Sequence, residues 1–582
     1  MRYNILDKKI KVISFDVFDT LITRLLPVNL LYKSIENKLI QKGFFFAKNF
    51  ANLRLQSEKE LLKNSNGIYT IEDIYNTSVF SLLNKEQKEI LINSENNAEI
   101  NNCVSNPKAK AIYNQIKSRY KIVCTSDMYL SSQVIRQILN KNLYYPDDIF
   151  VSCECGKSKR NFDLYRHVLD KLSLKKSELL HIGDAVRSDF FNPKLLGINS
   201  FHYNNSNLTK SEYCEIFGRE ILSPVVFEFC HWLHNRYSKE NLIFLSREGC
   251  VLCEYYNLLF STKYEPVFVS RKSVIKGIAY KYLQNDRLSD LYNISSHEYH
   301  ETVLDFSQRI GIDYNNHKKL FERNGFFENS LVNNELFKFI EGNKTKFILD
   351  LYKNQILLKG YLNNFFCNSR VNVLVDIGWS GSIQNIISEF YEEDKNLKIY
   401  GAYLGINNTL NKSGFLFNSK DNTCNNVLCF SGLLEILFMP KIGSVLGYKE
   451  DKNSSKILPV FDKFEFSDES FKIVEDIQLS VKNSLAQLSV MSDESIFNKN
   501  EIVKKFVDFG CKPQQSCLNI FKDLKLYDNG HEYYLLCHYS FEDYIKLSKL
   551  YSDFRNSKWK SGFLRNIFKV NLPYYKLINF FR

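Results

Sequence analysis

The sequence predicts an α/β protein with a doubly wound parallel sheet near its N-terminus, a second Rossmann-like α/β domain and a helical C-terminal region. Three observations lead to this prediction. Short apolar runs alternate with helical patterns over residues 8–203, a second alternation begins near residue 240, and helical periodicity dominates after residue 456. The domains are accordingly expected at residues 1–205, 212–455 and 456–582.

Composition limits the class of protein. The chain has 582 residues, of which 44% are hydrophobic, so several domains can each bury a core. The N-terminal residues lack the apolar core and cleavage site of a signal peptide, and the longest apolar region, 427–447, is interrupted by Glu435, Pro440 and Lys441. The 14 cysteines of the whole chain are scattered along the sequence, which is typical of reduced thiols. We therefore expect a cytoplasmic protein.

The net charge of +12 is partly concentrated in the C-terminal tail, residues 555–582, which has no acidic residue and interleaves Lys and Arg with aromatic side chains. Such a tail fits either a peripheral contact with the anionic inner face of a membrane or a basic helix packed on its own domain. No nucleic-acid reader motif accompanies the charge, so nucleic acid is not expected as a partner.

The strands predicted in the first domain end in oxygen-bearing side chains. These strands are expected at residues 11–16, 121–126, 149–152 and 179–182. The polar residues at their ends are Asp16, Asp19, Thr20, Ser126, Asp127, Asp184 and Asp189, with Lys157 and Lys159 ahead of a helix at 161–172. In a parallel sheet the loops after the strands share one crevice. Carboxylates, a hydroxyl and an ammonium group in that crevice suit Mg²⁺ and a phosphoryl group, because hard divalent ions prefer oxygen ligands.

A helical cap is predicted between the first and second of these strands. Residues 26–105 lack clear strand patterns, and their periodicity favours helices at 30–39, 51–62, 71–83 and 85–101. The cap would be an insertion in the first connection from strand to helix.

The order of these motifs over about residues 8–203 resembles the haloacid dehalogenase (HAD) superfamily. The family's motifs are a strand before Asp-x-x-x-Thr, a strand ending in Ser or Thr, a Lys before a helix, and Gly-Asp-x-x-x-x-Asp. This chain contains similar motifs in the same order: Asp16–Thr20, then Ser126, then Lys159, and finally Gly183-Asp184 with Asp189. A helical insertion after the first motif is similar to the family's first cap class (C1).

This resemblance implies a Mg²⁺-dependent hydrolase that acts on a phosphorylated small molecule. Asp16 would be the nucleophile that forms an aspartyl-phosphate, Ser126 would bind the phosphoryl group, and Lys159 would stabilise Asp16 and the developing charge. The implied metal site consists of Asp16, Asp184 and the carbonyl group of Phe18, with support from Asp189. Lys157, two residues before Lys159, is the alternative for its role.

One position departs from the family pattern. Phosphatases of the family place a second Asp, the general acid and base, two residues after the nucleophile, and here that position is Phe18. A general acid typically contributes about 10² to 10⁴ in rate. Three alternatives follow: Asp19 replaces it, the substrate has a good leaving group such as an acyl phosphate or a phosphoanhydride, or only binding remains. Dehalogenases of the superfamily carry an aromatic residue there but use no metal, whereas this chain keeps Asp184 and Asp189.

A separate ligand site is predicted in the second domain. Strands expected at 241–245, 266–269 and 372–375 are followed by Ser246, Arg247, Arg271, Asp376, Gly378, Gly381 and Ser382. A glycine-rich turn at a helix start exposes backbone N–H groups to an anion, and arginines pair with phosphate. The alternative is a set of tight turns with surface arginines.

A HAD-like block followed by the motifs at 246–249 and 376–384 resembles bacterial two-domain proteins linked to surface-polysaccharide biosynthesis. The resemblance implies a sugar-phosphate or nucleotide-sugar ligand. Two other functions stay open: a glycosyl- or other transferase with its main active site in the second domain, and a non-catalytic ligand-binding scaffold.

Overall fold

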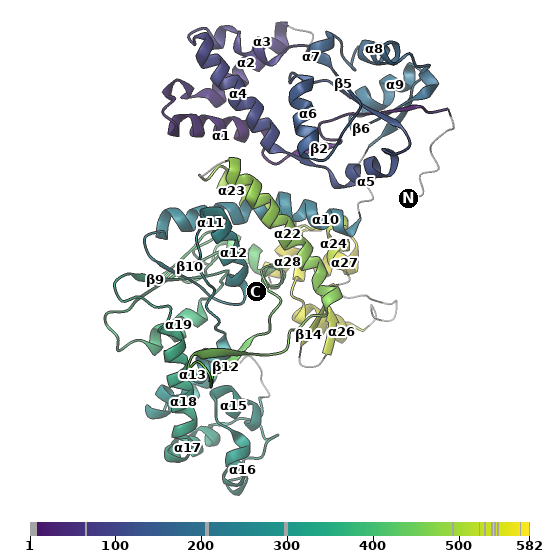
Figure 1. The fold of residues 1–582 in the computed structure, drawn as a ribbon. Helices are drawn as coiled ribbons and strands as arrows, with labels where there is room; N and C mark the ends of the chain where they lie inside the picture. The colour runs from purple at the N-terminus through teal and green to yellow at the C-terminus, as the bar shows by residue number, and fades with distance from the viewer. Residues whose placement is uncertain are drawn as a thin grey trace. The chain divides into compact units, whose positions relative to one another are not determined.

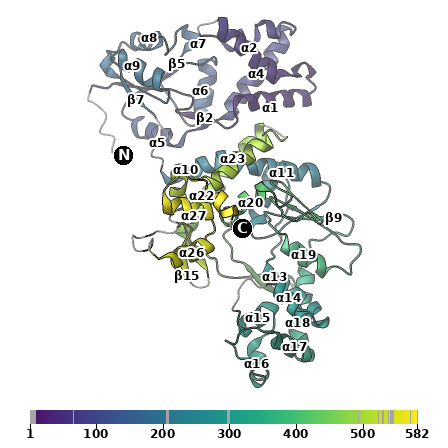
Figure 2. The same ribbon diagram turned by 180° about the vertical axis from the view of Figure 1, so that it is seen from behind.

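The chain is grouped by its internal contacts into two compact units, residues 1–223 with 480–498 and residues 224–479 with 499–582. The computed structural model (Figures 1 and 2) describes residues 9–64, 67–203, 209–295, 301–491, 494–522 and 524–580, the last without 529–530, 537–538, 540–542, 544–545 and 571. The expected linker at 203–211 therefore falls partly, at 204–208, outside the described residues.

The division differs from the three domains expected from sequence. Helix α10 (Lys210–Phe217) belongs to the first unit, and the long helix α22 (Asp468–Met491) begins in the second unit and ends in the first. The hydroxyl group of Ser480 donates a 2.6 Å hydrogen bond to the carbonyl group of Glu215, which joins the later part of α22 to the segment that contains α10. Helical periodicity alone does not reveal where along α22 the chain changes units.

A five-stranded sheet in the order β5-β4-β1-β6-β7 forms the centre of the first unit, and every neighbouring pair is parallel. The strands are β1 (Val12–Phe15), β4 (Lys121–Ser126), β5 (Asp148–Val151), β6 (Leu179–Gly183) and β7 (Asn199–His202). Helices α5 (Pro107–Ile116), α6 (Ser132–Lys141), α7 (Ser152–Cys155), α8 (Asp163–Leu172) and α9 (Asn192–Leu195) flank it (Figure 1). The predicted doubly wound sheet is confirmed, with β7 as an additional edge strand.

The cap between β1 and β4 is helical, as predicted. It comprises α1 (Val28–Gln41), α2 (Phe50–Asn64), α3 (Ile71–Tyr75) and α4 (Lys85–Asn102), and a short antiparallel pair, β2 (Ile22–Arg24) with β3 (Cys103–Ser105), closes its base. The helix expected at 71–83 ends at Tyr75 because the hydroxyl groups of Ser57 and Thr77 both donate hydrogen bonds to the carbonyl group of Ile74.

A buried ion pair holds the cap helices together. Arg54 on α2 donates two hydrogen bonds to Glu95 on α4, Nε to Oε2 and Nη2 to Oε1, both 2.8 Å long, and both side chains are fully buried. The hydroxyl group of Tyr75 donates to Glu95 Oε2 at 2.5 Å, and the rings of Tyr32 and Tyr129 lie 4.8 and 5.1 Å from the guanidinium carbon. A buried charge is tolerated only when it is paired and hydrogen-bonded, so the loss of one partner of this pair is expected to destabilise the cap.

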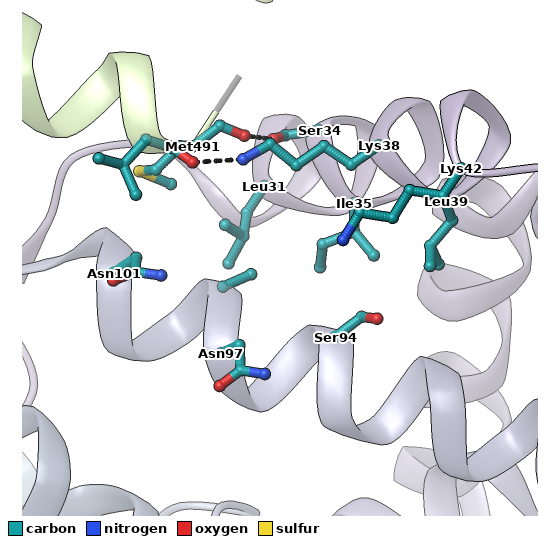
Figure 3. Close-up of a pocket in the computed structure, with 12 residues that line it drawn as sticks. Leu31, Ser34, Ile35, Lys38, Leu39, Lys42, Ser94, Asn97, Asn101 and Met491 are labelled. Atoms are coloured by element: carbon teal, nitrogen blue, oxygen red, sulfur yellow. Dashed lines mark hydrogen bonds between the residues drawn. The ribbon is translucent and has the colours of Figure 1, made fainter. Parts of the chain in front are cut away.

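The end of α22 packs on the cap beside a cavity of about 210 Å³ between α1 and α4 (Figure 3). The hydroxyl group of Ser34 donates to the carbonyl group of Met491 at 2.7 Å, and the Lys38 ammonium group donates to the carbonyl group of Val490. These bonds hold residues 490–491 on the outer surface of α1 and explain why 480–498 belongs to the first unit.

A four-stranded sheet in the order β11-β10-β9-β8, parallel throughout, organises the second unit. Its strands are β8 (Asn241–Phe244), β9 (Val371–Asp376), β10 (Lys398–Tyr403) and β11 (Lys412–Gly414). The strand expected at 266–269 is reduced to one bridge between Val267 and Leu245, because the chain turns at Ser270 into the next helix.

Helices make up most of the segment between β8 and β9 (Figure 2). The helices of this part of the chain are α11 (Ser223–Tyr237), α12 (Glu248–Phe260), α13 (Arg271–Gln284), α14 (Leu288–Ser295), α15 (Val303–Ile310), α16 (Tyr314–Arg323), α17 (Asn334–Gly342), α18 (Lys344–Leu362), α19 (Ser382–Phe390), α20 (Asn422–Leu428) and α21 (Ser431–Leu437). Of these, α15, α16 and α17 gather with α13 and α18 beside the sheet (Figure 2). Leu374 of β9 and the buried faces of α13, α15 and α18 share one hydrophobic core.

The region after residue 456 is mainly helical, as expected, but one hairpin reaches into its start and a second lies within it. Besides α22, its helices are α23 (Lys499–Cys511), α24 (Gln515–Phe521), α26 (Leu547–Asn556), α27 (Lys560–Phe568) and α28 (Tyr574–Phe580). The hairpins pair β12 (Val445–Glu450) with β13 (Ile457–Phe461) and β14 (Lys525–Asp528) with β15 (His531–Tyr534).

Part of the aromatic tail is buried in the second unit. Trp559 is fully buried and donates from Nε1 to the carbonyl group of Gly510 at 2.8 Å, and Phe563 and Ile567 are buried as well. Among the described tail residues, Phe568, Val570, Leu572 and Leu577 are exposed, and the membrane contact expected from sequence stays a prediction. Among the described residues, no helix combines the length and apolar character needed to span a bilayer.

Candidate active site

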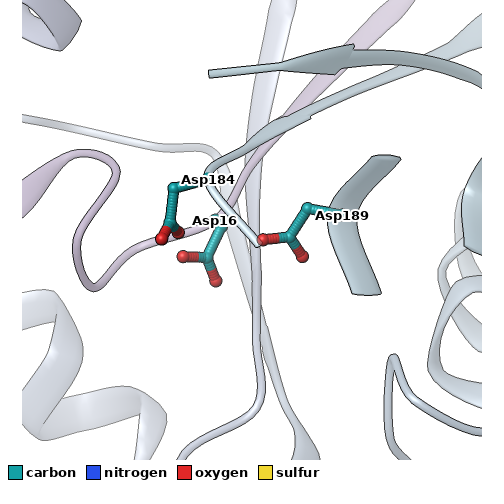
Figure 4. Close-up of side chains that lie close together, drawn as sticks. All are labelled: Asp16, Asp184 and Asp189. Atoms are coloured by element: carbon teal, nitrogen blue, oxygen red, sulfur yellow. The ribbon is translucent and has the colours of Figure 1, made fainter. Parts of the chain in front are cut away.

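Three carboxylates meet at the carboxyl edge of the first sheet. Phe15 of β1 is in register with Cys124 of β4 and Ile182 of β6, so the residues that follow these strands emerge at the same edge. Asp16, Asp184 and Asp189 each place a carboxylate oxygen within 4.8 Å of the other two (Figure 4). Asp16 and Asp189 are buried, and Asp184 is half-buried.

Lys159 connects two of these carboxylates. Its Nζ atom lies 2.6 Å from Asp16 Oδ1 and 2.7 Å from Asp189 Oδ1, and its side chain is 5% exposed. The backbone N–H of Lys159 donates to both oxygens of Asp127, at 2.9 and 3.1 Å, which fixes the loop that carries it. Lys157 instead places its Nζ atom 3.4 Å from Nδ1 of His167. The structure therefore brings Lys159, and not Lys157, to the carboxylates.

The charge states follow from burial and from these contacts. Burial raises the pKa of Asp16 to about 7, with Lys159 opposing the shift and Asp189 adding to it. Burial alone would lower the pKa of Lys159, but Asp16 and Asp189 raise it well above its usual value. Burial would likewise raise the pKa of Asp189, yet Lys159 and His181 hold it well below its usual value. Lys159 and Asp189 thus form a permanently charged ammonium–carboxylate pair beside Asp16. A further cation near Asp16 would favour the ionised form of its carboxyl group.

The loop after β6 is fixed around Asp184 and Asp189. Thr20 donates from Oγ1 to Asp184 Oδ1 and accepts from the Asp184 backbone N–H, both at 3.1 Å. The N–H of Ala185 donates to Asp189 Oδ2 at 3.1 Å. A Cβ atom on Gly183 would lie 2.5 Å from that oxygen, so the position requires glycine.

Sequence reasoning missed a buried hydrogen-bond chain behind Asp189. His181 Nε2 lies 3.4 Å from Asp189 Oδ1, His181 Nδ1 lies 2.9 Å from Ser14 Oγ, and Ser14 Oγ lies 2.8 Å from Thr125 Oγ1. Burial lowers the pKa of His181 and favours neutral imidazole, which donates at Nε2 to Asp189 and accepts at Nδ1 from Ser14. The available signal was a polar residue in the middle of an otherwise apolar buried strand.

An aromatic ring occupies the position of the family's general acid. The guanidinium carbon of Arg24 lies 4.4 Å from the centre of the Phe18 ring, and Arg24 donates to Glu99 of α4 from Nε at 2.9 Å and from Nη2 at 3.1 Å. Asp19, the substitute suggested by sequence, is exposed with a left-handed φ of 60° and is not one of the three clustered carboxylates. Ser126 lies buried at the end of β4. Phosphoryl binding by its hydroxyl group and metal binding by the Phe18 carbonyl group both stay predictions.

The residues predicted for a second site also come together. Ser246, Arg247, Arg271, Asp376, Gly378, Gly381 and Ser382 all line one cavity of about 450 Å³ in the second unit. Glu435 also lines it. That these residues bind a ligand stays a prediction.

A comparison with protein families assigns the N-terminal part of the chain. Residues 10–190 match the family model for haloacid dehalogenase-like hydrolases. No curated protein sequence matches the chain.

Solved structures to which the chain is similar include YfnB from Bacillus subtilis bound to magnesium (17% identity, 35% of this chain, 92% of that chain, TM-score 0.25) and a HAD phosphatase from Thermococcus onnurineus (17%, 34%, 89%, 0.25). A third is a 2-haloacid dehalogenase from Pseudomonas syringae pv. Tomato DC3000 (13%, 34%, 89%, 0.27). With the family match, the parallel sheet and the carboxylate cluster taken together, residues 10–190 of this chain are a haloacid dehalogenase-like hydrolase domain.

Proposed function

We propose that the chain is a Mg²⁺-dependent phosphohydrolase that acts through an aspartyl-phosphate on Asp16. The observation that carries this proposal is the convergence of Asp16, Asp184 and Asp189 with the Lys159 ammonium group directly on Asp16. The HAD-like family match supports a hydrolase, and the phosphoryl specificity is our inference from the charges around Asp16.

The residues present fit a magnesium ion. Asp184 uses Oδ1 for Thr20, and Asp189 uses its two oxygens for Lys159, His181 and Ala185. Asp16 and Asp184 would therefore hold the metal directly, and Asp189 would support the site through Lys159 and hydrogen bonds. When bound, the ion would polarise the phosphoryl group and offset its charge.

The chain's own residues would divide the reaction into two displacements. An oxygen of Asp16 attacks phosphorus and forms an O–P bond while the bond to the leaving oxygen breaks, and water then cleaves the aspartyl-phosphate to release inorganic phosphate. Lys159 orients Asp16 and offsets the charge that develops on the phosphoryl oxygens, and Ser126 donates a hydrogen bond to one of them.

The Phe18 ring limits which substrates react well. It supplies no proton to a leaving alkoxide, so we propose that substrates with leaving groups of low pKa, such as acyl phosphates and phosphoanhydrides, are preferred. The resemblance to proteins of surface-polysaccharide biosynthesis further suggests a phosphorylated sugar. The thirteen cysteines within the described part of the chain all carry free thiols, which supports our proposal of a reducing, cytoplasmic location.

A metal-removal experiment tests this function. Phosphate release from a panel of acyl, sugar and nucleotide phosphates should stop in EDTA and return with excess Mg²⁺, and Asp184→Asn should raise the Mg²⁺ concentration needed for half-maximal rate by about 10- to 100-fold. Asp170→Asn, which changes an exposed carboxylate of α8, is the matched control and should behave as wild type. Absence of turnover on the whole panel with Mg²⁺ present would favour the non-catalytic scaffold.

Lys159→Met should lower kcat by about 10² to 10³, because it removes the cation nearest the developing charge while keeping much of the side-chain volume. Lys157→Met, two residues away, should leave kcat within a few-fold of wild type. Equal losses in both variants would show that the loop, and not the Lys159 ammonium group, is what catalysis requires. Steady-state kinetics at saturating Mg²⁺ measures the difference.

A further inference from the structure

The second unit contains a cavity that the hydrolase chemistry does not use. Its volume of about 450 Å³ lies within the range of small-molecule sites in proteins. Every residue that lines it belongs to residues 245–444 of the second unit, whereas the HAD-like domain ends at residue 190. It is therefore a candidate site of its own.

Helix N-termini border this cavity. Glu248 begins α12 and Ser382 begins α19, helices of 13 and 9 residues, and neither helix has a side-chain hydrogen bond at its N-cap. At α19 the first backbone N–H groups thus lack the usual side-chain acceptor at the edge of the cavity, whereas at α12 the Glu248 carboxyl group accepts from the backbone N–H groups of Arg247 and Glu248. Gly378, with a φ of +128°, lets the loop before α19 approach the carbonyl group of Gly405, since a Cβ atom there would lie 2.0 Å from that oxygen.

Cationic side chains surround the same space: Arg247, Arg271, Lys272 and Arg309. Arg271 Nη2 donates to Ser382 Oγ at 3.2 Å, which places its guanidinium group at the start of α19. Arg309 forms two 2.6 Å hydrogen bonds to Glu301, but its Nη1 atom is buried with no hydrogen-bond partner among the described residues. A buried guanidinium N–H without an acceptor is costly, and Arg309 is one of the residues that line the cavity.

Carboxyl groups also belong to the lining: Glu248, Asp376 and Glu435. Asp376 accepts from the N–H of Ile377 at 2.8 Å, and Glu435 accepts from Trp379 Nε1 at 3.2 Å. Burial, and then the neighbouring Glu248, raises the pKa of Asp376 well above its usual value. A carboxyl group that keeps its proton repels an anion less and both donates and accepts hydrogen bonds, as ligand hydroxyl groups require.

We propose that this cavity binds a small molecule that carries both a phosphoryl group and hydroxyl groups. The phosphoryl group would lie at the N-terminus of α19, beside Arg271 and Arg309, and the hydroxyl groups would contact Asp376 and Glu435. A site of this kind requires no catalysis at Asp16, so the inference is independent of the proposed hydrolase function.

Calorimetric titration of the full-length chain with inorganic pyrophosphate tests the phosphoryl half. Wild type should bind pyrophosphate, and Arg271→Ala should weaken binding by roughly 10- to 100-fold, the loss expected for one charge-assisted contact. Arg323→Ala, an exposed arginine of α16 in the same unit, is the control and should bind as wild type. Equal affinity in wild type and Arg271→Ala would place the anion elsewhere, including at the first site, and would overturn the inference, as would absence of binding.

Two further measurements keep the test decisive. If Arg271→Ala fails to fold by circular dichroism, Ser382→Ala replaces it, because it removes only the hydroxyl group at the start of α19, and it should weaken pyrophosphate binding by several-fold. For the hydroxyl half the probe is glucose 1-phosphate, with Asp16→Asn as the parent chain to prevent hydrolysis. Asp376→Ala should weaken binding of glucose 1-phosphate at least tenfold more than that of pyrophosphate, and equal effects on both probes would refute the role of the carboxyl groups.

Discussion

Asp16→Asn is expected to lower phosphate release by at least about 10³-fold, the largest effect on activity in this protein. The amide group matches the carboxylate in shape but is a poor nucleophile, and Asp16 is the clustered carboxylate that directly follows the central strand β1. The fold should survive, because Lys159 keeps its 2.7 Å contact with Asp189. Rapid acid quenching followed by peptide mass spectrometry should detect a phosphoryl group on Asp16 in wild type only.

Asp19→Asn is the matched control for that variant. Asp19 follows on the same loop but is exposed, so its loss should change the rate for acyl phosphates by no more than a few-fold. A selective loss on substrates with poor leaving groups would identify Asp19 as the substitute general acid. Retention of more than a tenth of wild-type activity by Asp16→Asn would contradict the covalent mechanism.

Arg54→Ala should have the largest effect on stability, about 3–5 kcal/mol in the free energy of opening the cap. The substitution leaves the Glu95 carboxylate fully buried without its cation, and the remaining hydrogen bond from Tyr75 does not neutralise the charge. Because a chain of two units need not unfold in one step, hydrogen exchange of the α2 and α4 amides is the appropriate measurement.

Lys59→Ala provides the comparison for the cap variant, since Lys59 is an exposed residue of the same helix and its loss should change stability by less than about 0.5 kcal/mol. The double variant Arg54→Met/Glu95→Met should recover much of the loss, because removing both charges avoids an unpaired one. If Arg54→Ala exchanged no faster than Lys59→Ala, the ion pair would not be what stabilises the cap.

The sequence predicted those helices and strands whose own side chains determine their conformation. Strand β1 was recognisable because its buried Val-Ile-Ser-Phe run is too short for a helix and ends at a carboxylate. Strand β7 was not, since Asn199-Ser-Phe-His has one strongly apolar residue and becomes a strand only by pairing with β6 at the sheet edge. The hairpin of β14 and β15 likewise depends on the pairing of two strands, and neither strand has a hydrophobic periodicity that predicts it.

The residues of the candidate site were also predictable only in part. Motif spacing identified Asp16, Asp184 and Asp189, because parallel strands carry their ends to one edge. The choice between Lys159 and Lys157 needed coordinates, since both precede the same helix and only one points to Asp16. Arg309 in the second unit could not be foreseen, because it comes from α15 and not from a strand end.

The most direct test of the account is anomalous scattering from manganese in crystals grown with Mn²⁺ in place of Mg²⁺. Manganese accepts similar oxygen ligands and reveals its position independently of the refined coordinates. A single strong peak within bonding distance of Asp16 and Asp184, absent in Asp184→Asn crystals, is the predicted result. A peak remote from these carboxylates, or none at saturating Mn²⁺, would contradict the proposal that this edge of the sheet is a metal-dependent catalytic site.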